Sequence, residues 1–410
     1  MIRVPEEREL LDMACRSCGN RHVRLVIDLG DQPLANRLVR PGAEDPPSYP
    51  LRLGYCEHCT LLQIDATIPR DDMFRDYVYV SGTTDTLRKH FAETTERLSA
   101  YLSDPGELVV DIGSNDGTWL ETWKGKCRRQ GVDPAYTQFK MMLDKGIDGI
   151  CAYFDLGTAR ALRSMCGPAK LITSAGSFFH MEDLHGAVEG VKHLLADDGV
   201  FVCQAISGND MISGNAFDQV LHEHLCYYTP FSFAELMRQH GLELFEVHRH
   251  AIHGGTCEYH VRKLSTGVSR FRWESAPTFY DCEQFARRVL NIQRDLMVVL
   301  EEYRAQDKRV YAYGAPGKGG TLLNSFWVEE HLVQFATEKN PLKFGLEIPG
   351  CRIQILDESK VLGYHPDAYL VLAWNFLDEF LVKEREYLKA GGEFIVPVPE
   401  VRIITGADIP

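Results

Sequence analysis

The chain has 410 residues, of which 45% are apolar and 25% are charged, proportions typical of globular proteins. This length exceeds what a single hydrophobic core usually organises, so we expect two or three domains. The net charge is −14, from 58 acidic residues against 44 lysines and arginines, and this balance argues against binding to nucleic acid or to anionic membranes.

The amino terminus reads M-I-R-V-P-E-E-R-E, without the apolar core of a signal peptide. No segment of the sequence approaches the length that spans a bilayer. We therefore expect a cytoplasmic protein that does not contact a membrane. In a reducing compartment the twelve cysteines serve packing or metal binding more often than disulfides, and eight of them are scattered singly, as buried core residues are.

The other four cysteines form two C-x-x-C pairs, Cys15 with Cys18 and Cys56 with Cys59. Two such pairs can close a tetrahedral zinc site, which is structural because four cysteines leave no position open for substrate. A redox-active pair is the alternative. His58 lies inside the second pair, where geometry disfavours it as a ligand. We expect residues 1–73 to be a zinc-binding module whose core is too small to fold without metal.

Three further stretches of this region are predicted to lack regular structure or to connect domains. Residues 31–36, D-Q-P-L-A-N, and the proline-rich residues 41–50 are predicted to be loops of the zinc module. Residues 74–82, F-R-D-Y-V-Y-V-S-G, alternate aromatic and aliphatic side chains. We expect them to link the module to the next domain.

Residues 108–120, L-V-V-D-I-G-S-N-D-G-T-W-L, are predicted to form a buried strand, a glycine turn and the start of a helix. Asp111 falls at the end of the strand, and Gly113 and Gly117 let the backbone pass close to a ligand. The dinucleotide motif G-x-G-x-x-G is not matched, because Asp111 replaces its first glycine. An acid at this turn favours a cation or hydroxyl groups, which S-adenosylmethionine (SAM) carries as sulfonium, ammonium and ribose.

A second acid follows where a ribose ligand is expected. Residues 129–132 are a predicted short strand that ends in Asp133, about twenty residues beyond the first turn, as the ribose-binding carboxylate does in doubly wound folds. The alternative is that Asp133 only caps a helix beside Pro134. The residues expected to bind SAM are Asp111, Gly113, Ser114, Asn115, Gly117, Asp133 and Ser174.

Strands continue to alternate with helices after this point. Residues 170–174 and 199–203 are short apolar segments, and residues 182–195 between them have helical spacing. This alternation predicts a parallel, doubly wound α/β sheet.

Residues 221–225, L-H-E-H-L, offer candidate catalytic bases. If this segment is extended, His222 and His224 share one face and Glu223 lies on the other. An imidazole titrates near neutrality and suits proton removal beside a carbonyl, and a carboxylate can orient it. His180, after the predicted fourth strand, is a second candidate. Any single histidine, His222 above all, can instead be a hydrogen-bonded structural residue.

The last third of the chain repeats the pattern of strand, glycine turn and helix. Residues 277–307 are predicted to form a long linker helix, and residues 309–314 a strand. The turn that follows, A-P-G-K-G-G-T at 315–321, does not match a P-loop. It is either a phosphate seat with Lys318 as counter-charge or a tight structural turn.

Together these motifs resemble the sugar C-methyltransferases that act on nucleotide-linked keto-deoxysugars in antibiotic biosynthesis, and the similarity spans essentially the whole chain. Further motifs that carry it are L-G-D-Q-P-L-A-N at 29–36, Y-V-Y-V-S-G at 77–82, H-G-G at 253–255 and K-N-P at 339–341. The resemblance implies three parts. These are the zinc module (1–73), a class I SAM-dependent methyltransferase domain (74–276) and a Rossmann-like domain with its linker helix (277–410), with substrate between the last two.

The resemblance also implies a reaction, in which a base removes the C-3′ proton beside a 4′-ketone and the enolate attacks the methyl group of SAM. It assigns the base to His224, the companion carboxylate to Glu223 and a polar group facing the sugar to His180. The aromatic residues expected in the active site are Tyr77 and Tyr79, and the residues expected at the substrate are His222, His253 and Lys318.

Three departures from the family pattern fall on the acceptor side. Leu221 replaces the tyrosine that commonly precedes H-E-H, residues 174–177 replace an asparagine-rich strand end, and residues 204–206 replace an acidic or aromatic pattern. The SAM-side motifs are intact. We therefore hypothesise C-methyl transfer to an acceptor that differs from the common dTDP-4-keto-deoxysugars. A C- or O-methyltransferase with a non-nucleotide acceptor is the alternative.

Two rival classes remain. An NAD(P)-dependent oxidoreductase would use the same architecture, but neither glycine turn carries G-x-G-x-x-G. A zinc-ribbon protein that binds nucleic acid would explain the cysteines but not the acidic charge. We expect a small-molecule substrate and a monomer or weak homo-oligomer.

Overall fold

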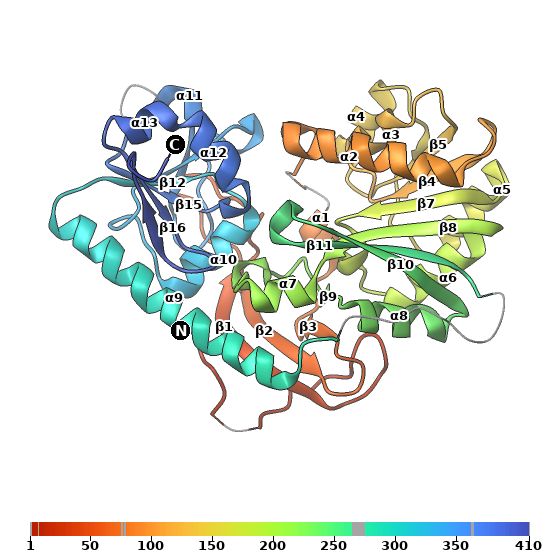
Figure 1. Ribbon diagram of the computed structural model, residues 1–410, viewed down its shortest axis with the longest axis horizontal. Helices are drawn as coiled ribbons and strands as arrows, with labels where there is room; N and C mark the ends of the chain where they lie inside the picture. The colour runs from red at the N-terminus through yellow and green to blue at the C-terminus, as the bar shows by residue number, and fades with distance from the viewer. Residues whose placement is uncertain are drawn as a thin grey trace.

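The computed structural model describes residues 2–6, 8–74, 77, 79–264, 275–361 and 365–409. Within these residues the strands form three sheets, which lie in the amino-terminal, central and carboxyl-terminal parts of the chain (Figure 1). Of the predicted connecting stretch 74–82, residues 75, 76 and 78 lie outside the described residues.

The amino-terminal sheet is antiparallel and has the strand order β1-β2-β3-β9. Its strands are β1 (Val23–Pro33), β2 (Ser48–Cys56), β3 (Leu62–Ile64) and β9 (Cys226–Tyr227). The loop predictions were wrong at residues 31–33 and 48–50, because these residues pair with one another at the ends of β1 and β2. Proline is tolerated at strand ends, where its missing N–H breaks no inner ladder. The strand β9 ties this sheet to the segment that contains His224.

The central sheet has the order β6-β5-β4-β7-β8-β11-β10. Its strands are β4 (Leu108–Ile112), β5 (Arg128–Val132), β6 (Gly149–Ile150), β7 (Ala169–Ala175), β8 (Leu195–Ile206), β10 (Leu242–His250) and β11 (Thr256–Lys263). The first five strands in this order are parallel, and β11 inserts antiparallel between β8 and β10. The predicted doubly wound sheet is thus confirmed.

Helices cover both faces of the central sheet (Figure 1). Val109 and Leu171 pack with α2 (Asp85–Leu98), α3 (Thr118–Thr122) and α4 (Tyr136–Asp144). Val110 and Ile172, one residue further along each strand, belong to the core that contains α5 (Leu156–Cys166), α6 (Leu184–Leu194) and α8 (Pro230–Gln239). Successive strand residues face opposite sides, so these apolar runs are buried on both.

The linker helix α9 (Phe279–Ala305) leads into the carboxyl-terminal sheet, whose order is β14-β13-β12-β15-β16-β17. Its strands are β12 (Val310–Tyr313), β13 (Phe335–Glu338), β14 (Gln354–Asp357), β15 (Ala368–Val371), β16 (Glu393–Val396) and β17 (Arg402–Ile404). All pairs are parallel except β16 with β17. The helix α10 (Gly317–Phe326) follows β12.

The remaining helices are short. They are α1 (Arg70–Phe74), α7 (Gly208–Ser213), α11 (Glu358–Val361), α12 (Leu377–Lys383) and α13 (Arg385–Lys389). The single 3-10 turns are η1 (Ser81–Thr83), η2 (Ser99–Tyr101), η3 (Phe178–His180), η4 (Phe217–Gln219), η5 (Ile252–Gly254), η6 (Pro341–Lys343) and η7 (Trp374–Phe376). Among the helices of the described residues, none has the length and hydropathy of a membrane span.

Both glycine turns lie at places where the strand order reverses. The strand β4 lies between β5 and β7, and β12 lies between β13 and β15. In open α/β sheets such a reversal leaves a crevice beyond the carboxyl ends of the strands, where ligands bind. The fold therefore has two such crevices, one for each parallel sheet.

Candidate functional site

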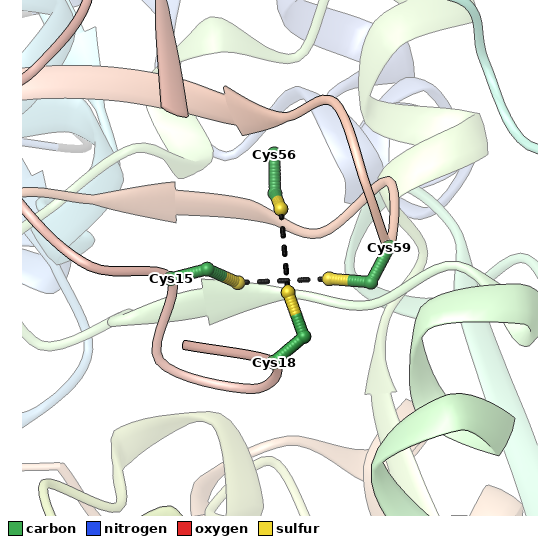
Figure 2. Close-up of side chains that lie close together, drawn as sticks. All are labelled: Cys15, Cys18, Cys56 and Cys59. Atoms are coloured by element: carbon green, nitrogen blue, oxygen red, sulfur yellow. Dashed lines mark hydrogen bonds between the residues drawn. The ribbon is translucent and has the colours of Figure 1, made fainter. Parts of the chain in front are cut away.

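The four paired cysteines converge on one point between β2 and the loop before β1 (Figure 2). The Sγ atoms of Cys15 and Cys59 lie 3.6 Å apart, as do those of Cys18 and Cys56. In a tetrahedron with metal–sulfur distances of about 2.3 Å, sulfur atoms are separated by about 3.8 Å. A disulfide needs about 2.05 Å. The geometry therefore fits a zinc ion and not a redox disulfide.

Each cysteine pair is built as a metal-binding turn. The amides of Gly19 and Thr60 donate to the carbonyls of Cys15 and Cys56, both at 2.9 Å, and both donors have positive φ angles. Gln63 Nε2 also donates to Cys15 Sγ at 3.2 Å, which orients one thiolate and offsets part of its charge.

The glycine turn after β4 packs too closely for any side chain at Gly113. Its φ is +72°, and a Cβ there would lie 2.4 Å from Ser177. Ser177 Oγ donates to the Ile112 carbonyl at 2.7 Å. The turn therefore presents bare backbone to the crevice, as a close ligand requires.

Asp133 lies at the end of β5 and faces the same turn. Its Oδ2 accepts from the Asn115 amide at 2.7 Å, and its Oδ1 accepts from the Ala135 amide at 2.8 Å. Burial raises the pKa of Asp133 to about 6. The carboxylate thus accepts a hydrogen bond from the amide before α4, as a capping residue does, and Asp133 also lines the cavity. Because each oxygen has a second lone pair, it can still accept from ribose hydroxyls.

The other residues predicted to bind SAM divide into two groups. Gly113 and Asn115 line the cavity. Those that do not line it are Asp111, Ser114, Gly117 and Ser174. Asp111 instead accepts a hydrogen bond from Thr173 at 2.7 Å, and Ser174 shares one with Ser177. These four residues support the glycine turn and its neighbouring strands without lining the cavity.

We expect Asp133→Asn to weaken SAM binding by about ten- to a hundredfold, because a hydrogen bond to a charged group contributes about 1.5–3 kcal/mol. Isothermal titration calorimetry measures the change. Asp144→Asn, which removes an exposed carboxylate from the nearby helix α4, is the control and should bind SAM normally. Unchanged affinity in Asp133→Asn would mean that the carboxylate only caps the following turn.

Residues 221–225 do not form the extended segment considered from the sequence. His222 and Glu223 form a turn, so three successive side chains diverge. The ring of His222 is buried, and its Nε2 lies 3.2 and 3.3 Å from the backbone carbonyls of Tyr49 and Pro50. His222 is not among the described residues that line the cavity. Its place is structural, and the expected substrate contact is not formed there.

His224 faces the cavity in a defined tautomer. Its Nδ1 lies 2.9 Å from the Gln219 carbonyl. Because a carbonyl only accepts, Nδ1 carries the proton and Nε2 keeps a free lone pair. Burial lowers the pKa of His224 to about 4, so the ring is neutral at pH 7. A neutral imidazole with a free nitrogen is able to take up a proton.

His180 stacks on His224, with ring centroids 5.3 Å apart and an interplanar angle of 14°. On its other side it stacks on Phe74. Its Nε2 is buried and has no hydrogen-bond partner among the described residues. Burial lowers the pKa of His180 well below its ordinary value. The structure thus brings a second neutral imidazole to the cavity.

Glu223 is buried and held by two donors. Asn36 Nδ2 donates to its Oε1 at 2.7 Å, and Tyr77 Oη donates to its Oε2 at 3.2 Å. Burial raises the pKa of Glu223 to about 7, and both hydrogen bonds oppose the rise. The carboxyl group therefore lies close to the balance between its two protonation states at neutral pH.

The two tyrosines play different parts in the structure. The hydroxyl of Tyr77 donates to Glu223. Tyr79 instead contacts the glycine turn after β4, because its backbone carbonyl accepts from Asn115 Nδ2 at 3.2 Å. Gln138 Nε2 donates to both tyrosine carbonyls, at 2.6 and 3.1 Å. Both tyrosines line the cavity.

Lys318 is buried beside Asp218 at the start of α10. Its Nζ lies 3.8 Å from Asp218 Oδ2, too far for a hydrogen bond, and 3.7 Å from the ring centroid of Trp374. The Nζ atom has no hydrogen-bond partner among the described residues. Burial lowers the pKa of Lys318 to about 8. His253, with its own pKa lowered to about 4 by burial, also lines this end of the cavity.

One cavity of about 1080 Å³ is lined by residues of the glycine turn, of the H-E-H segment and of the turn before α10. It runs from Gly113 and Asp133, past His180, His224 and Glu223, to Lys318. Ligand pockets commonly have volumes of about 300–1,000 Å³, so this one has room for SAM and an acceptor together. Sequence reasoning missed the contacts of Asn36, Asp218 and Trp374. Only the L-G-D-Q-P-L-A-N motif had pointed toward one of them.

The strand order of the central sheet, its glycine turn and the acid after the next strand define a class I SAM-dependent methyltransferase. Three family models match the chain. They are "Putative zinc binding domain" at residues 15–74, "Methyltransferase domain" at 85–247 and "C-methyltransferase C-terminal domain" at 251–399.

C-methyltransferase NovU of Streptomyces niveus is 32% identical to the chain over 410 residues, covering 95% of this chain and 96% of the relative. The chain therefore belongs to this family of zinc-containing C-methyltransferases. It is a SAM-dependent C-methyltransferase with a structural zinc site, and Cys15, Cys18, Cys56 and Cys59 form the cluster that would hold the ion.

Solved methyltransferase structures are similar over part of the chain. A SAM-dependent methyltransferase from Clostridium acetobutylicum is 13% identical and aligns with a TM-score of 0.35, covering 45% of this chain and 94% of the other. The plantazolicin methyltransferase BpumL in complex with SAH is also 13% identical, with a TM-score of 0.35, 44% of this chain covered and 86% of the other.

Proposed function

We propose that the chain methylates the carbon beside the ketone of a nucleotide-linked keto-deoxysugar, with His224 as the base. One observation carries the proposal. His224 is neutral, its Nδ1 is fixed on the Gln219 carbonyl, and its Nε2 is free in a cavity that also contains the SAM turn and Lys318. A carbon nucleophile beside a ketone forms by loss of a proton, which a neutral imidazole can accept.

In this mechanism His224 Nε2 takes the proton from the carbon next to the ketone. The electron pair of that C–H bond moves into the carbonyl group and gives an enolate, whose carbon then forms the new bond to a methyl group. SAM, when bound, would supply that methyl group as an electrophile, since its S–CH3 bond breaks and the electron pair of that bond stays on the departing sulfur. We assign to the neutral His180, whose Nε2 has no partner among the described residues, the donation of a hydrogen bond from an Nε2–H tautomer to the developing oxyanion.

In the same proposal, Lys318 contacts the phosphates of the nucleotide. Its Nζ is nearly buried, lines the cavity and has no hydrogen-bond partner among the described residues. The α10 amino terminus beside it adds partial positive charge. Because Asp218 Oδ2 is 3.8 Å away, too far for a hydrogen bond, the amine can donate to a phosphate oxygen.

A different acceptor from the common dTDP-4-keto-deoxysugars is favoured by Leu221. This buried apolar residue lines the cavity next to the H-E-H segment. An acceptor that meets an alkyl side chain there needs no polar group at that point. A nucleotide sugar that lacks a hydroxyl group where it contacts Leu221 therefore fits better than one that has it. A non-nucleotide carbonyl compound is the alternative.

The test measures proton exchange at the acceptor carbon in D2O by NMR, together with methyl transfer by mass spectrometry. Nucleotide-linked 4-keto-deoxysugars are compared with the same sugars lacking the nucleotide. We expect exchange and methylation with the linked sugars, and Lys318→Met should raise their KM by about ten- to a hundredfold. Lys360→Met, which removes an exposed lysine, is the control. Equal activity on the unlinked sugars would overturn the nucleotide assignment.

A further inference from the structure

A segment of the zinc module reaches across to the carboxyl-terminal domain. Gln32 Nε2 donates to Ser325 Oγ of α10 at 2.7 Å. A few residues later, the Val39 amide donates to the Glu347 carbonyl at 3.0 Å, and the reverse bond measures 2.8 Å. We call residues 32–39 the module strap. It is anchored to the carboxyl-terminal domain near both of its ends.

Asn36 lies between these two anchors and enters the cavity. Its amide packs against Gly317, where an added Cβ would lie 2.9 Å from Asn36 Nδ2. The same Nδ2 donates to Glu223 Oε1 at 2.7 Å. One side chain of the zinc module thus contacts both the glycine turn before α10 and the carboxylate next to His224.

An amide NH₂ group only donates, so its short bond to Glu223 favours the ionised carboxylate. The other groups that act on this carboxylate are the Tyr77 hydroxyl, at 3.2 Å, and the positive charge of Lys343. Lys343 is itself engaged by the Ala315 carbonyl and by Glu338. Asn36 therefore provides the shortest hydrogen bond to the carboxylate among the described residues.

We propose that Asn36 is a positioning residue, through which the zinc module favours the ionised form of Glu223 and fixes its position next to His224. The inference rests on the proposed function, in which Glu223 assists the base. It gives the zinc module a second role: besides supporting its own fold, it completes the active site of the central domain.

The test uses the full-length enzyme in four variants. Asn36→Asp keeps the shape of the side chain but replaces the donor with an acceptor, and Asn36→Ala removes it. Arg37→Ala, which removes an exposed side chain next to Asn36 in the same strap, is the matched control, and Glu223→Gln is the reference. The measurements are kcat and KM against pH, and the carboxylic C=O infrared band that Glu223→Gln deletes.

We expect Asn36→Ala to lower kcat by about a hundredfold, the cost of misplacing a reacting group by about 1 Å, with little change in the KM for SAM. Loss of a donor to the carboxylate raises the pKa of Glu223. The acid limb of the kcat profile and the infrared titration should therefore both move to higher pH, further in Asn36→Asp. Neither should move in Arg37→Ala.

An infrared titration of Glu223 that is the same in Asn36→Ala and Asn36→Asp as in the unaltered enzyme would overturn the role of Asn36, whatever happens to kcat. Failure of the proposed function gives a different result. In that case Glu223→Gln itself keeps normal turnover, while the infrared titration still reports whether Asn36 controls the carboxylate.

Discussion

His224→Ala is expected to lower turnover by about a hundred- to ten-thousandfold, the usual contribution of a general base, and to abolish proton exchange at the acceptor carbon. The reason lies in the free Nε2, since the Nδ1 proton is committed to the Gln219 carbonyl. SAM binding should persist, because Gly113, Asn115 and Asp133 lie on other elements. Stopped assays of methyl transfer and NMR of exchange in D2O measure the two effects separately.

His193→Ala, which removes an exposed imidazole from α6, is the control for the loss of a histidine and should behave normally. Added imidazole should restore part of the activity of His224→Ala, because the deletion leaves space for a small base at the same place. Exchange at the normal rate in His224→Ala would exclude it as the base. His180 would then be the remaining imidazole in contact with that position.

The pH dependence separates the roles of His224 and Glu223. A base works when it is deprotonated, hence above its pKa. With its pKa at about 4, His224 stays available throughout the neutral range. Glu223, with its pKa at about 7, changes charge within that range and gains its carboxylate as the pH rises. We therefore expect Glu223 to give an acid limb near neutrality, which Glu223→Gln should remove from the kcat profile.

Local patterns were sufficient to predict the strands and glycine turns. Four of the five residues of Leu108–Ile112 are apolar, as suits a strand that is buried on both faces, and the glycine at position 113 signals the positive φ of the turn that follows. The same holds for the long helix α9 and for the cysteine pairs. Each of these features depends mainly on residues that are close together in the sequence, so a short stretch of sequence is enough to predict it.

Contacts between distant segments could not be predicted in this way. Asn36 meets Glu223 across 187 positions, and Trp374 Nε1 donates to Asp218 across 156. Nothing near either residue signals its partner. The H-E-H segment shows the same limit. An extended conformation was considered from the sequence, but His222 and Glu223 form a turn, and the His222 ring makes tertiary contacts with the backbone carbonyls of Tyr49 and Pro50.

The second large effect is expected from the zinc site. Cys56→Ser should unfold the amino-terminal module and abolish turnover. Structural zinc sites contribute about 10–16 kcal/mol of binding free energy, which equals or exceeds the total stability of a typical domain, about 5–15 kcal/mol. Zinc content by mass spectrometry, circular dichroism and limited proteolysis of residues 1–73 measure the loss. Cys151→Ser, at an exposed single cysteine, should change none of these.

Loss of the metal should disturb the position of the segment that contains His224 in two ways. The strand β3 pairs with β9, whose first residue lies two positions beyond His224, so a disordered module leaves that segment without its neighbour. The module strap also releases Glu223 when Asn36 moves away. The central sheet is stabilised by its own two helical layers and should remain able to bind SAM. Calorimetry and NMR of proton exchange on Cys56→Ser therefore test whether the zinc module controls the active site. Retained SAM binding with no proton exchange supports this coupling, whereas normal exchange without zinc contradicts it.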